Sequence, residues 1–402
     1  MSTDTAVASQ ASQENEFQTG RVATISATHA VHDTYTAFLA PLLPAFKESL
    51  ALSNTQAGLL TVFNQAPSVL QPLIGHLADR LTLRFVVILT PAVTATGMSL
   101  LGVAPSYLVL ALLLTVVGLS SATLHSVAPV IAGRLSGRNL GRGMGFWMVG
   151  GELGRTLGPL IIVGAVEFLG LGGTTWLMIG GWLTSILLYF VLGDVSARPV
   201  AETRGLPWKQ ALRAMGPLLV PLVGIIVVRS FMAASLTTYL PIFLTTEGAE
   251  LWFAGVSLSI LEGAGVVGAL LGGSLSDRLG RRTMLTVSLV STPALMLLFV
   301  VVAGWVRLPL LLALGLTSLS VTPVIMALVQ ESSPQNRALA NGTYMMLSFL
   351  IRSGVVVVVG ALGDTWGMRT AFIASAIIPL LGLPFLRMLP SRRETSIRHK
   401  QP

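Results

Sequence analysis

The sequence predicts an all-α integral membrane protein, with twelve transmembrane helices arranged as two six-helix bundles. Three observations favour this class. Hydrophobic residues make up 53% of the 402-residue chain and charged residues only 10%, whereas soluble proteins typically carry about 25% charged residues. The apolar residues gather in runs long enough to cross a bilayer. A short charged pattern also recurs once in each half of the chain.

A helix that crosses the hydrocarbon core of a bilayer needs roughly 20 mostly apolar residues. Glycine and proline inside such runs are tolerated better in lipid than in soluble helices. The twelve predicted spans run near 22–46, 55–78, 84–103, 106–133, 143–166, 173–193, 215–244, 252–275, 284–304, 308–330, 338–362 and 369–389.

The polar segments between and around these spans predict the domain boundaries. The first residues are rich in Ser, Thr, Gln and Glu, and they lack the apolar core of a signal peptide. The longest polar interruption follows the sixth span and contains Pro199 and Pro207. The predicted parts are a disordered cytoplasmic tail (1–20), a first bundle (21–193), a cytoplasmic linker (194–213), a second bundle (214–389) and a basic cytoplasmic tail (390–402).

The net charge of +8 is explained by topology. Of the 25 lysines and arginines, 19 fall on the side of the membrane that holds both termini, three on the other side and three inside spans. By the positive-inside rule both termini are cytoplasmic, and the expected location is the plasma membrane, the inner membrane of a bacterium. Nucleic acid is therefore not expected as a partner. The chain has no cysteine, which excludes disulfides.

The recurring pattern reads GHLADRLTLR at 75–84 and GSLSDRLGRR at 273–282, each after the second span of its half. Asp79 and Asp277 are 198 residues apart. The same offset superposes Gly75 on Gly273, Arg80 on Arg278 and Arg84 on Arg282. Both segments are therefore predicted to be the same loop of a duplicated six-helix unit, which is a known way to build a transporter around a central site.

The second copy, G-x-x-x-D-R-x-G-R-R, resembles the loop signature of the major facilitator superfamily. The resemblance implies the fold of that superfamily, transport by alternating access and a loop that holds the cytoplasmic side shut. In the first copy Thr82 and Leu83 replace a glycine and an arginine, so its turn is expected to differ. The implied gating residues are Gly75, Asp79, Arg80, Arg84, Gly273, Asp277, Arg278, Gly280, Arg281 and Arg282. The alternative is a loop that only anchors the topology.

The fifth span contains GFWMVGGELGRTLGP, with Gly145, Gly154, Gly158 and Pro159. This spacing resembles the antiporter signature of drug exporters in the superfamily, although Ile162 and Val163 stand where paired glycines normally follow. It favours export. Small residues four apart also give a face for tight helix packing, and packing alone is the alternative.

Longer stretches resemble the fosmidomycin-resistance group of drug exporters. They are HAVHDTYTAFLAPLLPAFKESLALSNTQAGLL from His29, LHSVAPVIAGR from Leu124, GGELGRTLGPLI from Gly150, and ALVQESSP with IIPLLGLPFL near the end of the chain. This resemblance implies a proton-coupled antiporter for a small molecule and leaves the substrate open.

Six charged residues fall near span centres, where insertion costs about 2.5–3.5 kcal/mol each, so they are expected to be functional. They are Asp33, Glu152, Arg155, Arg229, Glu262 and Arg352. Three acids and three arginines sum to zero charge, and pairing across the bundle lowers the cost of burying them.

The arginines are candidates for substrate binding. Arg155 shifted by the repeat offset falls one residue from Arg352, so the two occupy matching places in spans five and eleven. Such helices converge on a midplane cavity, where guanidinium groups suit an anionic or phosphonate-like ligand. Arg229 and His125 complete the predicted set. Alternatively, the arginines only neutralise acids, and His125 bonds to backbone freed by Pro129.

The first span carries His29, His32 and Asp33 as one stripe of titratable groups. Histidine titrates near neutral pH, and burial moves a carboxylate toward the same range, as proton coupling requires. Asp33, helped by both histidines, is the predicted proton carrier. Glu262 is the rival, and Glu152 is weaker because Arg155 holds it ionised. A structural polar stripe is the alternative. The two histidines and Asp33 could hold a metal ion, but a fourth ligand is lacking, so we predict no metal.

These observations predict a monomeric secondary transporter that needs no cofactor beyond a proton gradient. The expected activity is proton-coupled antiport, exporting a small anionic or drug-like molecule. The alternative is a proton-coupled symporter or a uniporter that imports a small organic anion or nutrient. A membrane enzyme is disfavoured because no nucleophile or metal constellation accompanies the acids. The sequence has no Walker-type loop, so an ATP-driven pump has no support.

Overall fold

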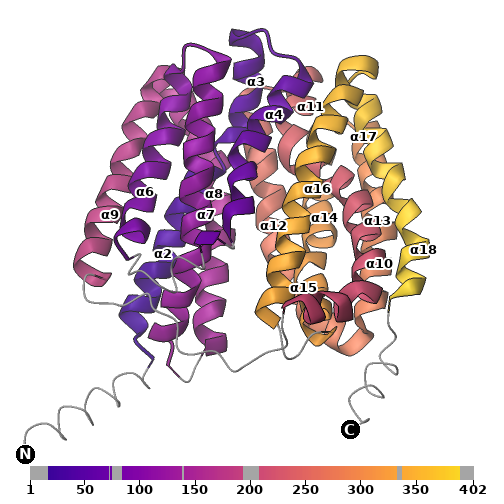
Figure 1. Ribbon diagram of the computed structural model, residues 1–402. Helices are drawn as coiled ribbons and strands as arrows, with labels where there is room; N and C mark the ends of the chain where they lie inside the picture. The colour runs from indigo at the N-terminus through magenta and orange to yellow at the C-terminus, as the bar shows by residue number, and fades with distance from the viewer. Residues whose placement is uncertain are drawn as a thin grey trace, which may run out of the picture. The chain divides into compact units, whose positions relative to one another are not determined.

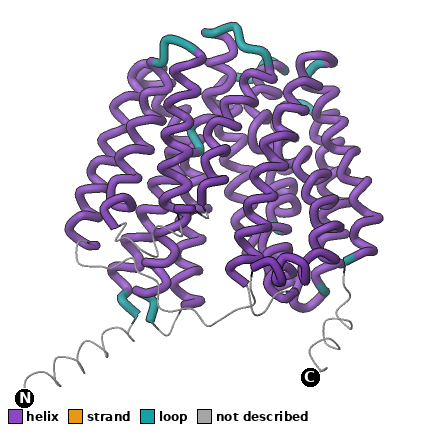
Figure 2. Tube along the Cα trace, viewed as in Figure 1, coloured by secondary structure: helices purple, strands orange, loops and turns teal. Residues whose placement is uncertain are grey.

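The computed structural model describes residues 17–71, 73–74, 84–137, 140–192, 208–332 and 337–389. Every regular element in these ranges is a helix (Figures 1 and 2). The predicted all-α class is confirmed. Most of the predicted tails and of the 194–213 linker lies outside the described residues.

Eight helical segments of the described chain are long and apolar enough to cross a membrane. They cover predicted spans four to twelve, with spans five and six joined in the single segment Gly143–Leu192. A shorter apolar helix, Val87–Val103, corresponds to span three. The total of twelve spans stays a prediction.

The chain forms two compact units, which are described separately. The first unit comprises residues 1–39 and 67–201, and the second comprises 40–66 and 202–402. The predicted bundle boundaries rest on the polar segments of the sequence and stay a prediction. In the structure, residues 40–66 pack with the second half of the chain.

The first unit is built around a buried apolar cluster to which α2, α6, α7, α8 and α9 all contribute, including Ile25, Val87, Leu124, Trp147 and Leu188. Within this unit α8 packs along α2, and α6 packs against α7 and α9. The bounds are α2 (Thr19–Thr36), α6 (Arg84–Ser99), η2 (Leu100–Val103), α7 (Tyr107–Leu135), α8 (Leu140–Gly173), η3 (Thr174–Leu177) and α9 (Met178–Leu192), with η1 (Ala66–Leu70) before α6.

Glycines of α8 bring it close to α2. A Cβ atom on Gly154 would lie 2.9 Å from the Cβ of Asp33, and one on Gly158 would lie 2.6 Å from the Cβ of Ala37. A Cβ on Gly145 would meet nothing within 4 Å. Two glycines of the antiporter-like motif therefore lie in the α2–α8 contact, and the third does not. Pro159 lies inside α8 beside this contact.

The second unit has its own buried apolar cluster, contributed by α10, α13, α15, α16 and α18. In this unit α12 packs along α14, and α4 packs along α16. The bounds are α3 (Leu39–Ser49), α4 (Asn54–Gln65), α10 (Trp208–Ala234), the π-helical η4 (Ser235–Tyr239), α11 (Leu240–Thr246), α12 (Leu251–Leu279), α13 (Arg281–Val301), η5 (Gly304–Val306), α14 (Arg307–Leu319), α15 (Val321–Ser332), α16 (Arg337–Trp366), α17 (Met368–Ile377), η6 (Ile378–Gly382) and α18 (Leu383–Met388).

The second copy of the repeated loop joins α12 to α13. Gly280 separates the two helices with φ of +93°, a conformation that glycine adopts without steric cost. Arg281 bonds to Ser276 and places Nη2 2.8 Å from Oε1 of Glu331 in α15. The loop is thus tied to a neighbouring helix of its own unit, while the side chains of Arg278 and Arg282 are exposed.

The remaining gating residues fall mostly outside the described part of the structure. Gly75, Asp79 and Arg80 are not described, and Arg84 is described only as the first residue of α6. The backbone of Gly273 and Asp277 lies in α12, but the side chain of Asp277 is not described. The gating role of both loops stays a prediction.

The segment α3–α4 is held to the second unit by polar contacts as well as by apolar packing. Asp364 of α16 caps α4, because its carboxylate accepts the backbone N–H groups of Asn54 at 2.6 Å and Thr55 at 2.9 Å. It also accepts the hydroxyl of Thr55 at 2.6 Å. A carboxylate at a helix N-terminus satisfies unpaired N–H groups and opposes the helix dipole.

Candidate functional site

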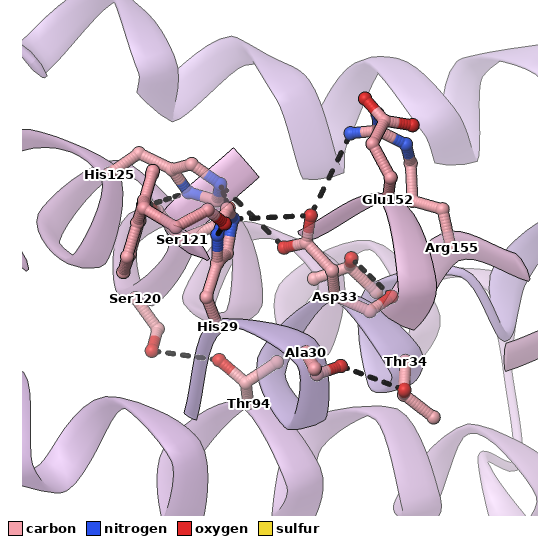
Figure 3. A network of polar contacts seen from close by, with 12 residues as sticks. His29, Ala30, Asp33, Thr34, Thr94, Ser120, Ser121, His125, Glu152 and Arg155 are labelled. Atoms are coloured by element: carbon pink, nitrogen blue, oxygen red, sulfur yellow. Dashed lines mark hydrogen bonds and ion pairs between the residues drawn. The ribbon is translucent and has the colours of Figure 1, made fainter. Parts of the chain in front are cut away.

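The candidate site surrounds Asp33 of α2, whose side chain is buried in the first unit. Three side chains that can carry positive charge approach its carboxylate (Figure 3). His29 Nε2 lies 3.4 Å from Oδ2, His125 Nε2 lies 3.6 Å from Oδ1, and Arg155 Nη1 lies 3.7 Å from Oδ2. We call His29, Asp33, His125, Glu152 and Arg155 the Asp33 cluster.

Helical spacing and small residues explain how the chain assembles this cluster. His29 and Asp33 are four residues apart and share one face of α2. Glu152 and Arg155 are three apart on α8 and form an ion pair. Beside them, Gly151 faces the site: a Cβ there would lie 2.5 Å from Cε1 of His29 and 3.1 Å from Oδ2 of Asp33. Glycine at this position leaves room for the cluster.

The backbone fixes the protonated nitrogen of two histidines. Nδ1 of His29 lies 2.8 Å from the carbonyl oxygen of Trp147, and Nδ1 of His125 lies 2.9 Å from that of Ser121. A carbonyl oxygen only accepts hydrogen bonds, so each Nδ1 carries the hydrogen. In the neutral rings both Nε2 atoms are therefore acceptors. The ring of His29 also stacks on Trp147, with 3.8 Å between centroids.

The two Nε2 atoms face each other at a distance of 3.1 Å. The lone pairs of both Nε2 atoms and the Asp33 carboxylate therefore lie close together. A proton or another cation between the acceptors stabilises such an arrangement, because it attracts all of them at once. The geometry calls for a proton or another cation at this point.

The charge of the cluster leads to the same conclusion. Arg155 pairs with Glu152 and also approaches Asp33, so two carboxylates share one guanidinium. With neutral histidines the cluster carries one net negative charge, and one added proton brings it to zero. Asp33 is 4% exposed, and an uncompensated charge in such a place is costly.

His32 lies near this cluster but does not join it. It is fully buried, and neither ring nitrogen has a hydrogen-bond partner in the described structure. Its ring centroid is 5.7 Å from that of His125. The sequence predicted that His32 helps Asp33, because both lie close together on α2. In the structure, His125 of α7 lies against the Asp33 carboxylate instead.

The alternative interpretation of His125, a bond to backbone freed by Pro129, does not match the structure. The carbonyl that Pro129 leaves without a helical donor is that of His125 itself, since a helical N–H bonds four residues back. The ring instead contacts the carbonyl of Ser121. Sequence reasoning placed His125 in a substrate cavity and missed its contact with Asp33. An isolated histidine in the long apolar run of α7 was the available signal.

The other predicted site residues lie in the second unit. Arg229 of α10 donates from Nη2 to the carbonyl oxygen of Ser318 at 2.8 Å, and its buried Nε has no hydrogen-bond partner among the described residues. Arg352 of α16 donates to the hydroxyl of Thr237 at 2.5 Å. Glu262 of α12 is buried. The predicted pairing of Arg155 with Arg352 across a cavity stays a prediction.

Comparison with known proteins identifies the family. The family model described as Major Facilitator Superfamily matches residues 25–355. The chain belongs to this superfamily. It is therefore a membrane transporter rather than an enzyme, and a small-molecule substrate is the general expectation for it.

Several curated members of the superfamily resemble the chain. The Fosmidomycin resistance protein of Escherichia coli strain K12 is 25% identical over 385 residues, which cover 93% of each chain. The uncharacterized MFS-type transporter YfnC of Bacillus subtilis strain 168 is 26% identical, covering 91% of this chain and 92% of the relative. An MFS-type efflux pump of Mycolicibacterium smegmatis is 33% identical over 218 residues, covering 48% of this chain and 49% of the relative.

Solved structures support the fold. A bacterial homologue of the human lysosomal transporter Spinster, solved in an inward-facing and unoccupied conformation, superposes with a TM-score of 0.80 at 15% identity, covering 93% of this chain and 98% of the other. A mutant of the nucleoside transporter NupG gives a TM-score of 0.76 at 14% identity, covering 92% of this chain and all of the other. At such identities the likeness concerns the fold alone.

Proposed function

We propose that this superfamily member is a proton-coupled antiporter that exports a small anionic molecule by alternating access. The observation that carries the proposal is the convergence of the two Nε2 atoms on the buried carboxylate of Asp33. These groups gain a favourable arrangement when they take up one proton. A group that loads on one side of the membrane and unloads on the other is what coupling requires.

Proton uptake changes the environment of Arg155. While Asp33 and Glu152 are both ionised, the guanidinium of Arg155 is held between them. A proton on the cluster weakens the attraction between Asp33 and Arg155, since it removes one negative charge. The side chain of Arg155 is 44% exposed, so a group released in this way is accessible to an anion. Proton and substrate binding are then linked through one shared arginine.

The second unit supports an anionic substrate independently. Arg229 is partly buried, and no carboxylate of the described residues lies within ion-pair distance of it. A buried guanidinium without a counter-ion is costly, and a bound oxyanion compensates it. Arg229, Arg352 and Arg155 are the proposed substrate contacts.

Similarity to named exporters supports the direction and the first substrate to test. The relatives include a fosmidomycin resistance protein and an efflux pump. Fosmidomycin is a phosphonate, an anion of the kind that guanidinium groups bind. The protein is accordingly expected to act as a monomer in the bacterial inner membrane, with cytoplasmic termini and a proton gradient as its only energy source.

The test uses purified protein in liposomes with the membrane potential clamped and fosmidomycin added outside. An antiporter accumulates it when the lumen is more acidic than the medium, because protons leave as substrate enters. A symporter accumulates it only under the opposite gradient, and a uniporter under neither. This result does not depend on the orientation of the protein, because antiport is reversible. Accumulation in alkaline-lumen vesicles alone contradicts the proposal.

A further inference from the structure

The sequence alone predicted no metal, because the histidines and Asp33 of α2 lacked a further ligand. His125 of α7 adds one, and we propose that His29, Asp33 and His125 form a binding site for a divalent transition metal ion such as Zn²⁺. The ligand atoms would be Nε2 of each histidine and a carboxylate oxygen of Asp33. All of these atoms lie within 4.8 Å of one another. The inference rests on the proposed function only for one consequence, the inhibition of transport. Binding itself stands on the geometry.

The distances between the ligand atoms fit a zinc ion. The two Nε2 atoms are 3.1 Å apart, and they lie 3.4 and 3.6 Å from the nearest oxygens of Asp33. Tetrahedral zinc with bonds of about 2.0–2.2 Å separates its ligands by roughly 3.3–3.6 Å. The three side chains already stand at nearly this spacing, so a metal ion needs only small adjustments.

The protonation of the histidines fits as well. Nδ1 of each ring donates to a backbone carbonyl, of Trp147 for His29 and of Ser121 for His125. A histidine that ligates a metal almost always donates its other ring N–H to a carbonyl or carboxylate, which orients the ring and fixes the free lone pair. Both Nε2 lone pairs are fixed in this way, and the two Nε2 atoms lie 3.1 Å apart.

The donor set defines the class of metal. Two imidazoles and one carboxylate suit Zn²⁺ and its neighbours in the first transition series, whereas Mg²⁺ and Ca²⁺ prefer oxygen ligands. Three protein ligands leave a fourth position for water or a substrate oxygen. Arg155 Nη1 lies 3.7 Å from Oδ2 and opposes the metal, although its pairing with Glu152 reduces that effect.

A bound metal would occupy the lone pairs that accept the coupling proton. Zn²⁺ is therefore expected to inhibit transport reversibly, and a chelator to restore it. Because the ligands reach the metal only as neutral rings and an ionised carboxylate, metal and proton exclude each other.

The binding test uses the full-length protein purified in detergent, with Zn²⁺ and Mg²⁺ compared by titration calorimetry. We expect one Zn²⁺ per chain and no measurable Mg²⁺ binding. His125→Gln and His29→Gln should each weaken Zn²⁺ binding by at least roughly tenfold. Co²⁺ in the same site should show the intense visible absorption of a tetrahedral ion.

The sequence supplies matched controls, because it contains five histidines. His32→Gln alters a buried histidine beside the site whose ring makes no hydrogen bond in the described structure, and His76→Gln and His399→Gln alter the remaining two. All three should bind Zn²⁺ as the parent does. Size-exclusion profiles and thermal unfolding establish that each variant is folded. The metal site is wrong if the parent protein does not bind stoichiometric Zn²⁺. It is also wrong if a control variant loses Zn²⁺ binding while folded His125→Gln keeps it.

The two proposals fail in different ways. If Zn²⁺ binds as described but proton gradients do not drive transport, the metal site stands and the proton-coupled function is wrong. If gradients drive transport while Zn²⁺ binds nowhere on the folded protein, the function stands and the metal site is wrong.

Discussion

Arg155 in α8 and Arg352 in α16 occupy nearly equivalent places in the sequence repeat, but their contacts differ. Arg155 lies between the carboxylates of Asp33 and Glu152. Arg352 donates to the hydroxyl of Thr237. A guanidinium thus lies in both places of the repeat, and in the first unit two carboxylates share it. We infer a division of labour in which the first unit handles protons and the second contributes cations for the substrate.

The prediction with the largest expected effect tests whether the first unit carries the coupling proton. Asp33→Asn keeps the shape of the side chain but removes the carboxylate that the histidines approach. We expect loss of uphill, gradient-driven transport, while counterflow exchange survives because it needs no net proton movement. Both are measured in the same liposomes with labelled substrate.

Glu262→Gln is the matched variant in the second unit. It should keep uphill transport, because Glu262 is not part of the Asp33 cluster. If Asp33→Asn still transports uphill while Glu262→Gln does not, the roles of the two units are reversed and our assignment is wrong.

The next prediction tests whether the second unit binds the substrate. Arg229→Gln removes a partly buried cation that has no carboxylate partner in the described structure. Hydrogen bonds to charged groups contribute about 1.5–3 kcal/mol, so the half-saturating concentration of an anionic substrate should rise by roughly tenfold to a hundredfold. The dependence on the sign of the pH gradient should stay unchanged.

Arg369→Gln serves as the control, because this exposed arginine of the same unit already pairs with Glu247 at 3.3 Å. It should leave the half-saturating concentration unaltered. An unchanged value for folded Arg229→Gln, measured in the same titration, would remove the second unit's proposed anion contact.

A smaller effect concerns the packing that assembles the first unit's site. Gly154→Ala places a methyl group 2.9 Å from the Cβ of Asp33 and against the backbone of α2. Overpacking of this kind typically costs about 1–3 kcal/mol, so the midpoint of thermal unfolding should fall and transport should weaken with it. Gly145→Ala is the control, since its methyl group meets nothing within 4 Å.

Gly145→Ala should be neutral or slightly stabilising, by up to about 1 kcal/mol, because alanine favours a helix over glycine. If both variants unfold at the parental temperature and transport normally, α2 and α8 do not need the close approach. The comparison is direct because both glycines lie on α8 and differ only in what they face.

The sequence predicted the features that depend on local composition and spacing. The all-helical class follows from apolar runs of helical length. Two contacts of the site follow from spacing on one helix, namely His29 with Asp33 and Glu152 with Arg155. Such pairs are three or four residues apart, so a single helix determines them.

The rest depends on contacts between distant segments. His125 lies 92 positions after Asp33, and nothing in its neighbourhood in the sequence indicates that it faces that carboxylate. Gly151 contributes by leaving space, which only its three-dimensional neighbours reveal. The cap of α4 by Asp364 joins groups 309 and 310 residues apart. A single sequence carries no record of such distances.

The prediction with the smallest expected effect tests whether Asp364 of the second unit has only a structural role. Asp364 accepts two backbone N–H groups at the start of α4, and neither histidine nor arginine is among its hydrogen-bond partners in the described structure. Removing a cap costs about 0.5–2 kcal/mol. Asp364→Ala should therefore lower the midpoint of thermal unfolding, and Asp364→Asn should lower it less, because its carbonyl oxygen can still accept one backbone N–H while its NH₂ group cannot accept the other. Both should keep the pH dependence of uphill transport. The decisive comparison is Asp364→Asn with Asp33→Asn, since both remove one negative charge and keep the shape. If folded Asp364→Asn also loses uphill transport but keeps exchange, the second unit carries a coupling carboxylate too, and the division of labour between the units has to be abandoned.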